Sequence, residues 1–165
     1  MAYPRVNISY KGGEYYLTWI RTDSIKNYSP ITQVYGVCFD SNKKILIARS
    51  SNEAQWQIPG GTPEKGETYK QTLKRELLEE TDVEVEDIKI LGVQRVEVPN
   101  QPKRIHYQLR CICNIKHLLA QTADPAKGKV WERKLVESNE VTKYVKWGKT
   151  GEAIFTDAIK LHTSS

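Results

Sequence analysis

Residues 61–83, GTPEKGETYKQTLKRELLEETDV, decide how this chain of 165 residues is interpreted. A helix is predicted over residues 69–81 of this stretch. Thr68 stands where the cap of that helix belongs, and Gln71, three residues later, completes a capping box. The helix is therefore expected to begin at a defined residue, with a fixed register for the side chains that follow.

Three glutamates gather on one face of the predicted helix. With about 100° per residue, Glu79 and Glu80 lie within about 60° of Glu76 on the helical wheel. Their face adjoins the apolar stripe of Leu73 and Leu77. Like charges at this spacing destabilise a helix by roughly 0.2–0.5 kcal/mol per pair, and partial burial adds to the cost. Mg²⁺ prefers carboxylate oxygens and would turn this repulsion into coordination. For the three glutamates alone, a solvated acidic face is the alternative.

Glycine and arginine residues around the helix favour the metal-binding interpretation. Gly60 and Gly61 let the backbone turn tightly before the helix and aim a carbonyl group inward. Arg75 can hold a carboxylate through two hydrogen bonds and so fix its direction. A simple ion pair between Glu67 and Arg75 is the alternative for those two residues.

Residues 61–83 as a whole resemble the Nudix box of the Nudix hydrolases. That pattern is a glycine, five residues, a glutamate, seven residues, and then Arg-Glu-apolar-any-Glu-Glu-any-Gly-apolar. The matching positions here are Gly61, Glu67, Arg75, Glu76, Leu77, Glu79, Glu80 and Val83. Asp82 replaces the expected glycine, and aspartate can adopt the left-handed conformation there at a cost. The resemblance extends more loosely over residues 35–161.

The resemblance implies a role for each acidic residue of the box. Glu79 and Glu80 would bind the metal, together with Glu76 and the carbonyl group of Gly60. Glu76 would also help to deprotonate the attacking water. The catalytic set would be completed by Arg75, which holds the carboxylates in place, and by Glu67, which orients the water or pairs with that arginine.

Candidate residues outside the box are less specific. Trp56, Tyr35 and Tyr107 could stack on a nucleobase, with packing in the core or at its rim as the alternative. A further acid is expected from outside the box, with Glu140, Glu137 and Glu97 as candidates. The residues proposed to bind substrate are thus Trp56, Tyr35 and Glu140. His106, His117 and His162 are isolated, and we assign them no role.

The rest of the chain predicts strands and one closing helix. Two hairpins are expected, one from residues 6–10 and 14–20 and the other from residues 34–39 and 45–48. Further strands are predicted over residues 85–98, 105–115 and 141–147, and a helix over residues 152–161. The fold class is therefore α/β: a Nudix-like α/β/α sandwich with a mixed β-sheet. Residues 1–165 form a single Nudix domain in this interpretation, and residues 1–31 form its N-terminal hairpin extension.

Composition places the chain among globular proteins of the cytoplasm. It has no apolar run near the roughly 18 residues that a membrane helix needs, and its start does not resemble a signal peptide. Three cysteines, Cys38, Cys111 and Cys113, are expected to be buried and reduced. The net charge of +5 and the pI of about 9.0 favour anionic partners, although the basic residues are scattered.

The combined prediction is metal-dependent hydrolysis of a diphosphate linkage in a nucleoside diphosphate derivative or a nucleoside triphosphate. The cofactor would be Mg²⁺, with Mn²⁺ as the other ion that suits the site. The position of Pro99 after the box resembles the ADP-ribose pyrophosphatase branch of the family. The position of Trp56 before the box resembles the branch that cleaves nucleoside triphosphates. Two alternatives stay open: a catalytically silent domain that senses nucleotides, and an RNA 5′-end pyrophosphohydrolase. A small nucleotide is the favoured partner over nucleic acid, no membrane partner is expected, and the N-terminal hairpin offers a surface for a homodimer.

Overall fold

The computed structural model describes residues 3–164, so residues 1, 2 and 165 of the predicted domain lie outside it. Three helices, one 3-10 turn and eight strands follow one another along these residues. In chain order they are β1 (Arg5–Tyr10), β2 (Gly13–Arg21), β3 (Ile31–Phe39), β4 (Ile45–Arg49), β5 (Gly60–Gly61), α1 (Tyr69–Thr81), β6 (Val83–Val98), β7 (Gln101–Leu118), β8 (Glu132–Val136), η1 (Ser138–Glu140), α2 (Val141–Tyr144) and α3 (Gly148–Thr163).

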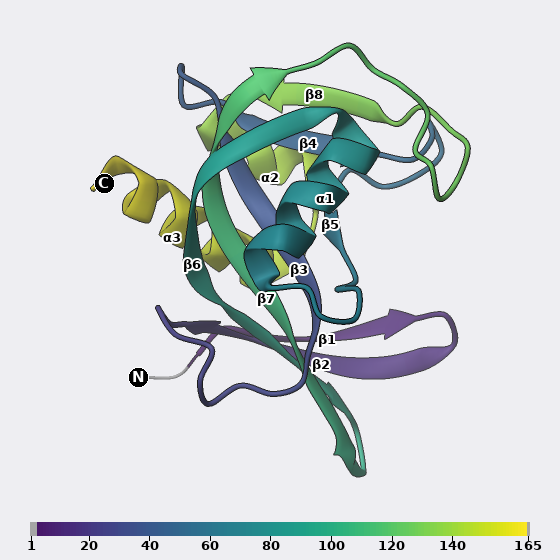
Figure 1. The fold of residues 1–165 in the computed structure, drawn as a ribbon. Helices are drawn as coiled ribbons and strands as arrows, with labels where there is room; N and C mark the ends of the chain where they lie inside the picture. Colours follow the sequence, from purple (N-terminus) through teal and green to yellow (C-terminus); the bar gives the residue numbers. More distant parts are fainter. Residues whose placement is uncertain (1–2, 165) are drawn as a thin grey trace.

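A single mixed sheet runs through the described chain in the order β1-β2-β6-β7-β3-β4-β8, and the short β5 pairs with β3. The β3–β7 pair is parallel, whereas the other pairs are antiparallel. Figure 1 shows α1 in front of the sheet and α2 and α3 behind it. The predicted α/β/α sandwich with a mixed sheet is therefore confirmed. The predicted N-terminal hairpin is also present, and β2 joins it to the sheet through β6.

Two apolar clusters hold the layers together. The cluster between the sheet and α3 includes Trp19, Val37, Phe39, Ile112, Ile154 and Phe155. The cluster between the sheet and α1 includes Val34, Cys38, Leu73, Leu77, Leu109 and Cys111. Burial of one leucine such as Leu77 contributes about 1.5–3 kcal/mol. The packing of α1 therefore fixes the direction in which its glutamates point.

The boundaries of α1 match the predicted residues 69–81. Thr68 and Gln71 form the expected capping box. Leu78, which the helical wheel places on the solvent side, is 43% exposed. At the other end, Asp82 adopts the left-handed conformation with φ 54° and ψ 41°. Its carboxylate accepts hydrogen bonds from the backbone N–H and the hydroxyl of Thr122, at 2.7 and 2.6 Å, and these offset the cost of the conformation.

Two predictions about the second half of the chain are wrong or incomplete. Residues 141–147 do not form a strand: Val141–Tyr144 is the short helix α2. Val141 and Val145 are both buried while Lys143 between them is exposed, which fits a helix, because in a strand all three side chains would share one face. The edge strand Glu132–Val136 was not predicted, because charged side chains obscure its alternation.

All three cysteines are free and buried, as expected. Among residues 3–164, no helix combines the length and the apolar character needed to cross a membrane.

Candidate active site

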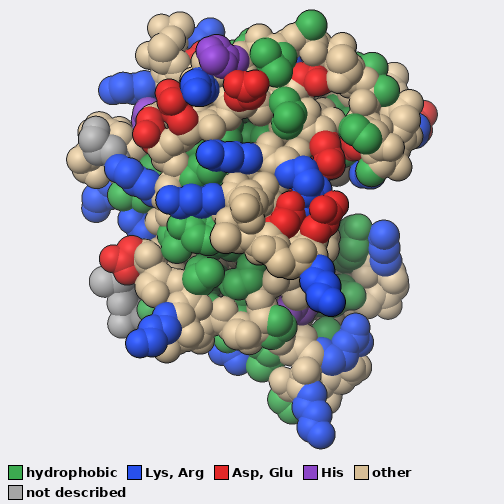
Figure 2. Space-filling model, in the orientation of Figure 1, with side chains coloured by type: hydrophobic (Ala, Val, Ile, Leu, Met, Phe, Trp, Pro, Cys, Tyr) green, Lys and Arg blue, Asp and Glu red, His purple; other side chains and the backbone are tan. Residues whose placement is uncertain are grey.

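The acidic face of α1 lines a cleft of about 690 Å³. Glu76, Glu79 and Glu80 all border this cleft, so the structure brings together the three glutamates that the helical wheel placed side by side. The opposite wall comes from β5 and from Tyr35 of β3, and the loop after β7 closes one end with Asp124. Figure 2 shows acidic side chains over α1 and the loop before it, above a hollow that separates them from the β1–β2 hairpin.

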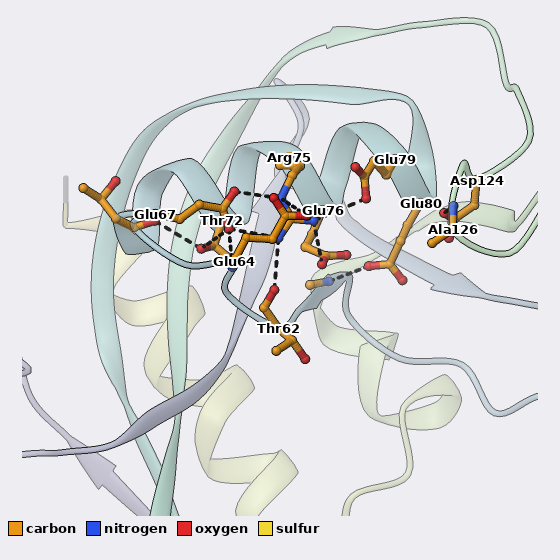
Figure 3. Close-up of polar contacts among 12 residues, drawn as sticks. Thr62, Glu64, Glu67, Thr72, Arg75, Glu76, Glu79, Glu80, Asp124 and Ala126 are labelled. Atoms are coloured by element: carbon orange, nitrogen blue, oxygen red, sulfur yellow. Dashed lines mark hydrogen bonds and ion pairs between the residues drawn. The ribbon is translucent and has the colours of Figure 1, made fainter.

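Arg75 is the centre of the polar network in this cleft (Figure 3). Its Nε and Nη2 donate to both carboxylate oxygens of Glu67, at 2.7 and 3.0 Å. Its Nη1 donates to Glu76 at 3.0 Å and to Glu79 at 3.3 Å. Its Nη2 also donates to the carbonyl oxygen of Thr62 at 3.0 Å. One guanidinium group therefore sets the direction of three carboxylates and of the loop before the helix.

Glu67 anchors this network at the N-terminal end of α1. Besides Arg75, its Oε1 accepts hydrogen bonds from the backbone N–H of Glu64 at 2.7 Å and from the hydroxyl of Thr72 at 3.0 Å. The hydrogen bonds from Arg75 are the main cause that lowers the pKa of Glu67 to about 2. Glu67 is therefore fully ionised at neutral pH, and its charge is compensated within the network.

The two glycines of β5 are needed for close packing. A β-carbon at Gly61 would lie 2.7 Å from Oε2 of Glu76, and one at Gly60 would lie 2.5 Å from Cα of Tyr35. The backbone N–H of Gly60 donates to Oε1 of Glu80 at 3.1 Å. A larger residue at Gly60 would collide with the backbone of β3, and one at Gly61 would displace the carboxylate of Glu76.

Burial raises the pKa of two of the carboxyl groups. Glu80 is 5% exposed, and burial raises its pKa to about 8, against the opposing hydrogen bond from Gly60. Burial is also the main cause that raises the pKa of Glu76, with Arg75 acting in the opposite direction. The site therefore contains two carboxyl groups whose pKa values are raised by burial, and perturbed pKa values are a common property of functional sites.

These carboxylates have the donor chemistry that a hard divalent cation requires, namely clustered oxygen atoms with uncompensated charge. Within residues 3–164, no group of three or more Asp, Glu, His or Cys side chains has the arrangement of a metal-binding site. Arg75 holds Glu76 and Glu79, while the Gly60 N–H holds Glu80. The residues fit a metal ion once these hydrogen bonds are exchanged for metal–oxygen contacts.

Two of the residues predicted to bind substrate, Trp56 and Glu140, are not among the described residues that line this cleft. The ring of Trp56 packs edge-on against Tyr144, and the Arg49 guanidinium lies 4.4 Å from the Trp56 ring centroid. Glu140 forms an ion pair with Lys143 at 3.4 Å. Tyr35 does border the cleft, next to the glutamates.

The other acids proposed from outside the box also have partners elsewhere. Glu137 lies 3.7 Å from Lys44, and Glu97 lies 3.3 Å from Arg95. Tyr107 packs against Tyr28, with ring centroids 5.4 Å apart. Neither these residues nor His106, His117 and His162 are among those that line the glutamate cleft, within residues 3–164.

The acid that the structure does bring to the cleft from outside the box is Asp124. It is 3% exposed, and its carboxylate accepts hydrogen bonds from Nε1 of Trp131 at 3.0 Å and from the backbone N–H of Ala126 at 2.9 Å. Sequence reasoning missed this residue. The available signal was the Asp-Pro-Ala-Lys-Gly run at residues 124–128, which is typical of a turn that an aspartate stabilises.

Comparison with known proteins shows the family of this chain. The family model described as the NUDIX domain matches residues 30–158. An RNA pyrophosphohydrolase of Stutzerimonas stutzeri is 40% identical over 73 residues, which are 42% of this chain and 46% of that protein. An RNA pyrophosphohydrolase of Pseudomonas fluorescens matches with the same identity and coverage. This chain thus matches about half the length of these curated relatives.

Solved structures show the same fold. The Bacillus subtilis pyrophosphohydrolase BsRppH, solved as a mutant, aligns with a TM-score of 0.67 and 18% identity, over 92% of each chain. A MutT protein from Methanosarcina mazei aligns with a TM-score of 0.57 and 17% identity, over 84% of this chain and 99% of that one. The match of the family model over most of the sequence shows that the chain belongs to the Nudix family.

Proposed function

We propose that this protein catalyses metal-dependent hydrolysis of a phosphoanhydride bond in a nucleotide that carries a 5′ diphosphate or triphosphate. The observation that supports this proposal most directly is the shared cleft of Glu76, Glu79 and Glu80, in which burial raises the pKa of two of the carboxyl groups. Two partly desolvated carboxylates beside a third are unfavourable without a cation, and a diphosphate brings one with it as its counter-ion.

In this proposal each residue of the network has a separate task. Glu79, Glu80 and Glu76 would hold Mg²⁺ or Mn²⁺ together with the carbonyl group of Gly60. The bound ion would neutralise charge on the diphosphate and make the attacking water more acidic. Glu76 would accept the proton of that water as a carboxylate, because burial raises its pKa and so makes it a stronger base.

Arg75 and Glu67 act as positioning residues. Arg75 touches Glu76 and Glu79 through one nitrogen atom, so its position controls two proposed ligands together. Glu67 fixes Arg75 through two hydrogen bonds. In the reaction, the water oxygen forms a bond to phosphorus and the bridging P–O bond breaks. The proton passes to Glu76, and both products leave with terminal phosphates.

The first experiment is a substrate panel with the full chain and Mg²⁺. It contains nucleoside triphosphates, ADP-ribose, dinucleoside polyphosphates and 5′-triphosphate RNA, with released products identified by chromatography. We expect turnover of at least one nucleotide, and a loss of about 100-fold or more in Glu79→Gln and in Glu80→Gln. Glu86→Gln, which changes an exposed glutamate on β6, is the matched control and should keep wild-type turnover. Normal turnover in both active-site variants would contradict the assignment of the metal ligands.

An RNA 5′ end is the second candidate substrate. It is favoured by the relatives named RNA pyrophosphohydrolases and by the net charge of +5. RNA would contact basic residues well beyond the cleft, so its binding should weaken steeply as salt rises. A free nucleotide binds within the cleft and should show a much shallower salt dependence. Fluorescence titration of 5′-triphosphate RNA and of the matching free nucleotide at several salt concentrations separates the two substrates.

A further inference from the structure

Lys127, in the loop after β7, is an exposed cation that lines the glutamate cleft. Burial raises the pKa of Glu80 to about 8, and the charge of Lys127 acts in the opposite direction. Lys127 is therefore close enough to the proposed metal ligands to act on one of them electrostatically. The proposed mechanism gives this lysine no task.

The cleft offers few cations to a substrate. Among the described residues that line it, Arg75 and Lys127 are the two that carry a positive charge. Arg75 makes five hydrogen bonds, which is the number of N–H groups in a guanidinium, so it has no donor left for a phosphate. Nζ of Lys127, in contrast, forms no ion pair within residues 3–164. Lys127 is thus the lining cation that remains available.

A turn that begins at Asp124 fixes the backbone that carries Lys127. The N–H groups of Lys127 and Gly128 donate to the carbonyl oxygen of Asp124, at 3.2 and 2.7 Å. The N–H of Asp124 donates to the carbonyl oxygen of Lys129 at 2.7 Å. Gly128 has a positive φ of 65°, a conformation that glycine adopts without strain. These bonds all join backbone atoms, so the turn does not need the ammonium group of Lys127.

The ring of Trp131 orients the ammonium group without neutralising it. Nζ of Lys127 lies 4.7 Å from the centroid of this ring. Trp131 is 3% exposed, lines the cleft and donates to Asp124, so its own position is fixed. The contact is an attraction between a charge and an aromatic face, and it leaves the N–H donors of the lysine free for an anion.

The loop forms the part of the cleft that lies beyond the glutamates of α1. Figure 3 shows Asp124 and Ala126 past Glu80, at the C-terminal end of the helix. The glutamates and their cation would hold one phosphate group of a nucleotide. A further phosphate group of the same chain would then face the loop, where Asp124 repels it and Lys127 attracts it. Lys127 is therefore the group that compensates charge at this end.

From this arrangement we propose that Lys127 is a specificity-determining residue, which binds the terminal phosphate of a nucleotide with a free 5′ diphosphate or triphosphate. The inference rests on the proposed function, because it concerns the nucleotide whose phosphates occupy the glutamate cleft. A free terminal phosphate carries about 1.5 to 2 negative charges at neutral pH, whereas a phosphate that is also bonded to a second sugar carries one. The compact charge of a lysine favours the more highly charged group. Lys127 would therefore select against substrates of the ADP-ribose type.

The test uses two nucleotide analogues that differ only at the terminal phosphate. They are α,β-methylene-ADP and α,β-methylene-ADP-ribose, and neither can be hydrolysed between its two phosphorus atoms. Binding of each is measured by calorimetry with the full chain and Mg²⁺. We expect wild type to bind the ADP analogue about tenfold or more tightly than the ADP-ribose analogue. Lys127→Met should lose this preference through weaker binding of the ADP analogue.

Matched variants separate a direct contact from a general effect of charge. Lys129→Met removes the same charge from an exposed residue of the same turn that is not among those lining the cleft, and it should keep the preference. Lys127→Arg keeps the charge and should retain most of the preference. The melting temperatures of all three variants should equal that of wild type, because the substitutions are on the surface.

A third ligand identifies the source of the terminal phosphate. Wild type should bind a short 5′-diphosphate RNA more tightly than the ADP analogue if the substrate is an RNA end, and less tightly if it is a free nucleotide. In both cases Lys127→Met should weaken binding of the RNA. Tighter binding of the RNA that does not depend on Lys127 would contradict the inference.

Four other results would each overturn the inference: no preference in wild type, no binding of either analogue, equal weakening of both analogues in Lys127→Met, or the same loss in Lys129→Met. Failure of the proposed function gives a different result. If wild type binds the ADP analogue selectively through Lys127 but hydrolyses no nucleotide in the substrate panel, the proposed function fails and the binding role stands. If wild type hydrolyses nucleotides and Lys127→Met keeps the wild-type preference, the proposed function stands and the role of Lys127 is wrong.

Discussion

Oε2 of Glu76 lies 2.7 Å from the point where a β-carbon would stand at Gly61. No real β-carbon tolerates a carboxylate oxygen at that distance, so the two residues restrict each other. The carboxylate occupies the space that the glycine leaves free, and Arg75 holds it there through a hydrogen bond of 3.0 Å. Gly61, the first glycine of the box, therefore leaves the space that the Glu76 carboxylate occupies.

Gly61→Ala should consequently lower turnover without unfolding the protein. The added methyl group displaces Glu76 by a fraction of a bond length or more, and misplacement of about 1 Å can cost about 100-fold in rate. Steady-state kinetics should show the loss mainly in kcat. Gly12→Ala, in the β1–β2 turn, is the control: it has a positive φ of 78° and nothing within 4 Å of the added carbon. Equal effects of both variants would show that a general disturbance of the fold, and not the collision with Glu76, controls the activity.

The ion pair of Glu67 with Arg75 predicts a specific dependence of stability on pH. The pKa of Glu67 is about 2 in the folded protein, compared with 4.5 for an ordinary glutamate. Between these values the unfolded chain binds more protons, so stability falls as the pH is lowered. The contribution is complete above about pH 4.5 and disappears as the pH falls towards about 2. Melting temperatures of wild type and Glu67→Gln should therefore converge at acid pH, and a constant difference down to about pH 2 would contradict the prediction.

Removal of divalent ions should stop the reaction and also lower stability. Dialysis against a chelator is expected to abolish turnover, and Mg²⁺ or Mn²⁺ should restore it. An ion present at about 100 times its Kd stabilises the folded state by about 2.7 kcal/mol. Mg²⁺ should therefore raise the melting temperature of wild type, and do so much less in Glu80→Gln. Undiminished turnover in excess chelator would exclude the metal-dependent mechanism.

Local sequence patterns predicted the elements near the box well. The capping box of Thr68 and Gln71 and the apolar positions of α1 are short-range signals, and the helix has the predicted limits. Patterns failed where tertiary contacts decide the conformation. Residues 141–144 are rich in β-forming side chains, yet Val141 and Val145 are buried while Lys143 between them is exposed, a pattern that fits a helix and not a strand. Strand β8 exists because β4 offers an edge with which to pair.

The candidate site follows the same division. The three glutamates and Arg75 could be placed from helical spacing, because all four residues belong to α1. Asp124 could not be found in this way, since it lies 44 residues after Glu80 in the chain and reaches the cleft through a loop.

The hydrogen bond between Nε1 of Trp131 and Asp124 predicts how this loop contributes to the cleft. Trp131 is 3% exposed, so loss of its acceptor leaves a buried N–H unsatisfied. Asp124→Ala should therefore destabilise the protein by about 1–3 kcal/mol, as measured by urea denaturation, and raise KM because the loop borders the cleft beside Glu80.

Trp131→Phe provides the double-mutant cycle for this pair. Because the phenylalanine needs no acceptor, Asp124→Ala should cost much less stability in a Trp131→Phe background than in wild type. Additive effects of the two substitutions would show that this hydrogen bond does not hold the loop. In that case the increase in KM should also vanish, because the loop would keep its position without Asp124.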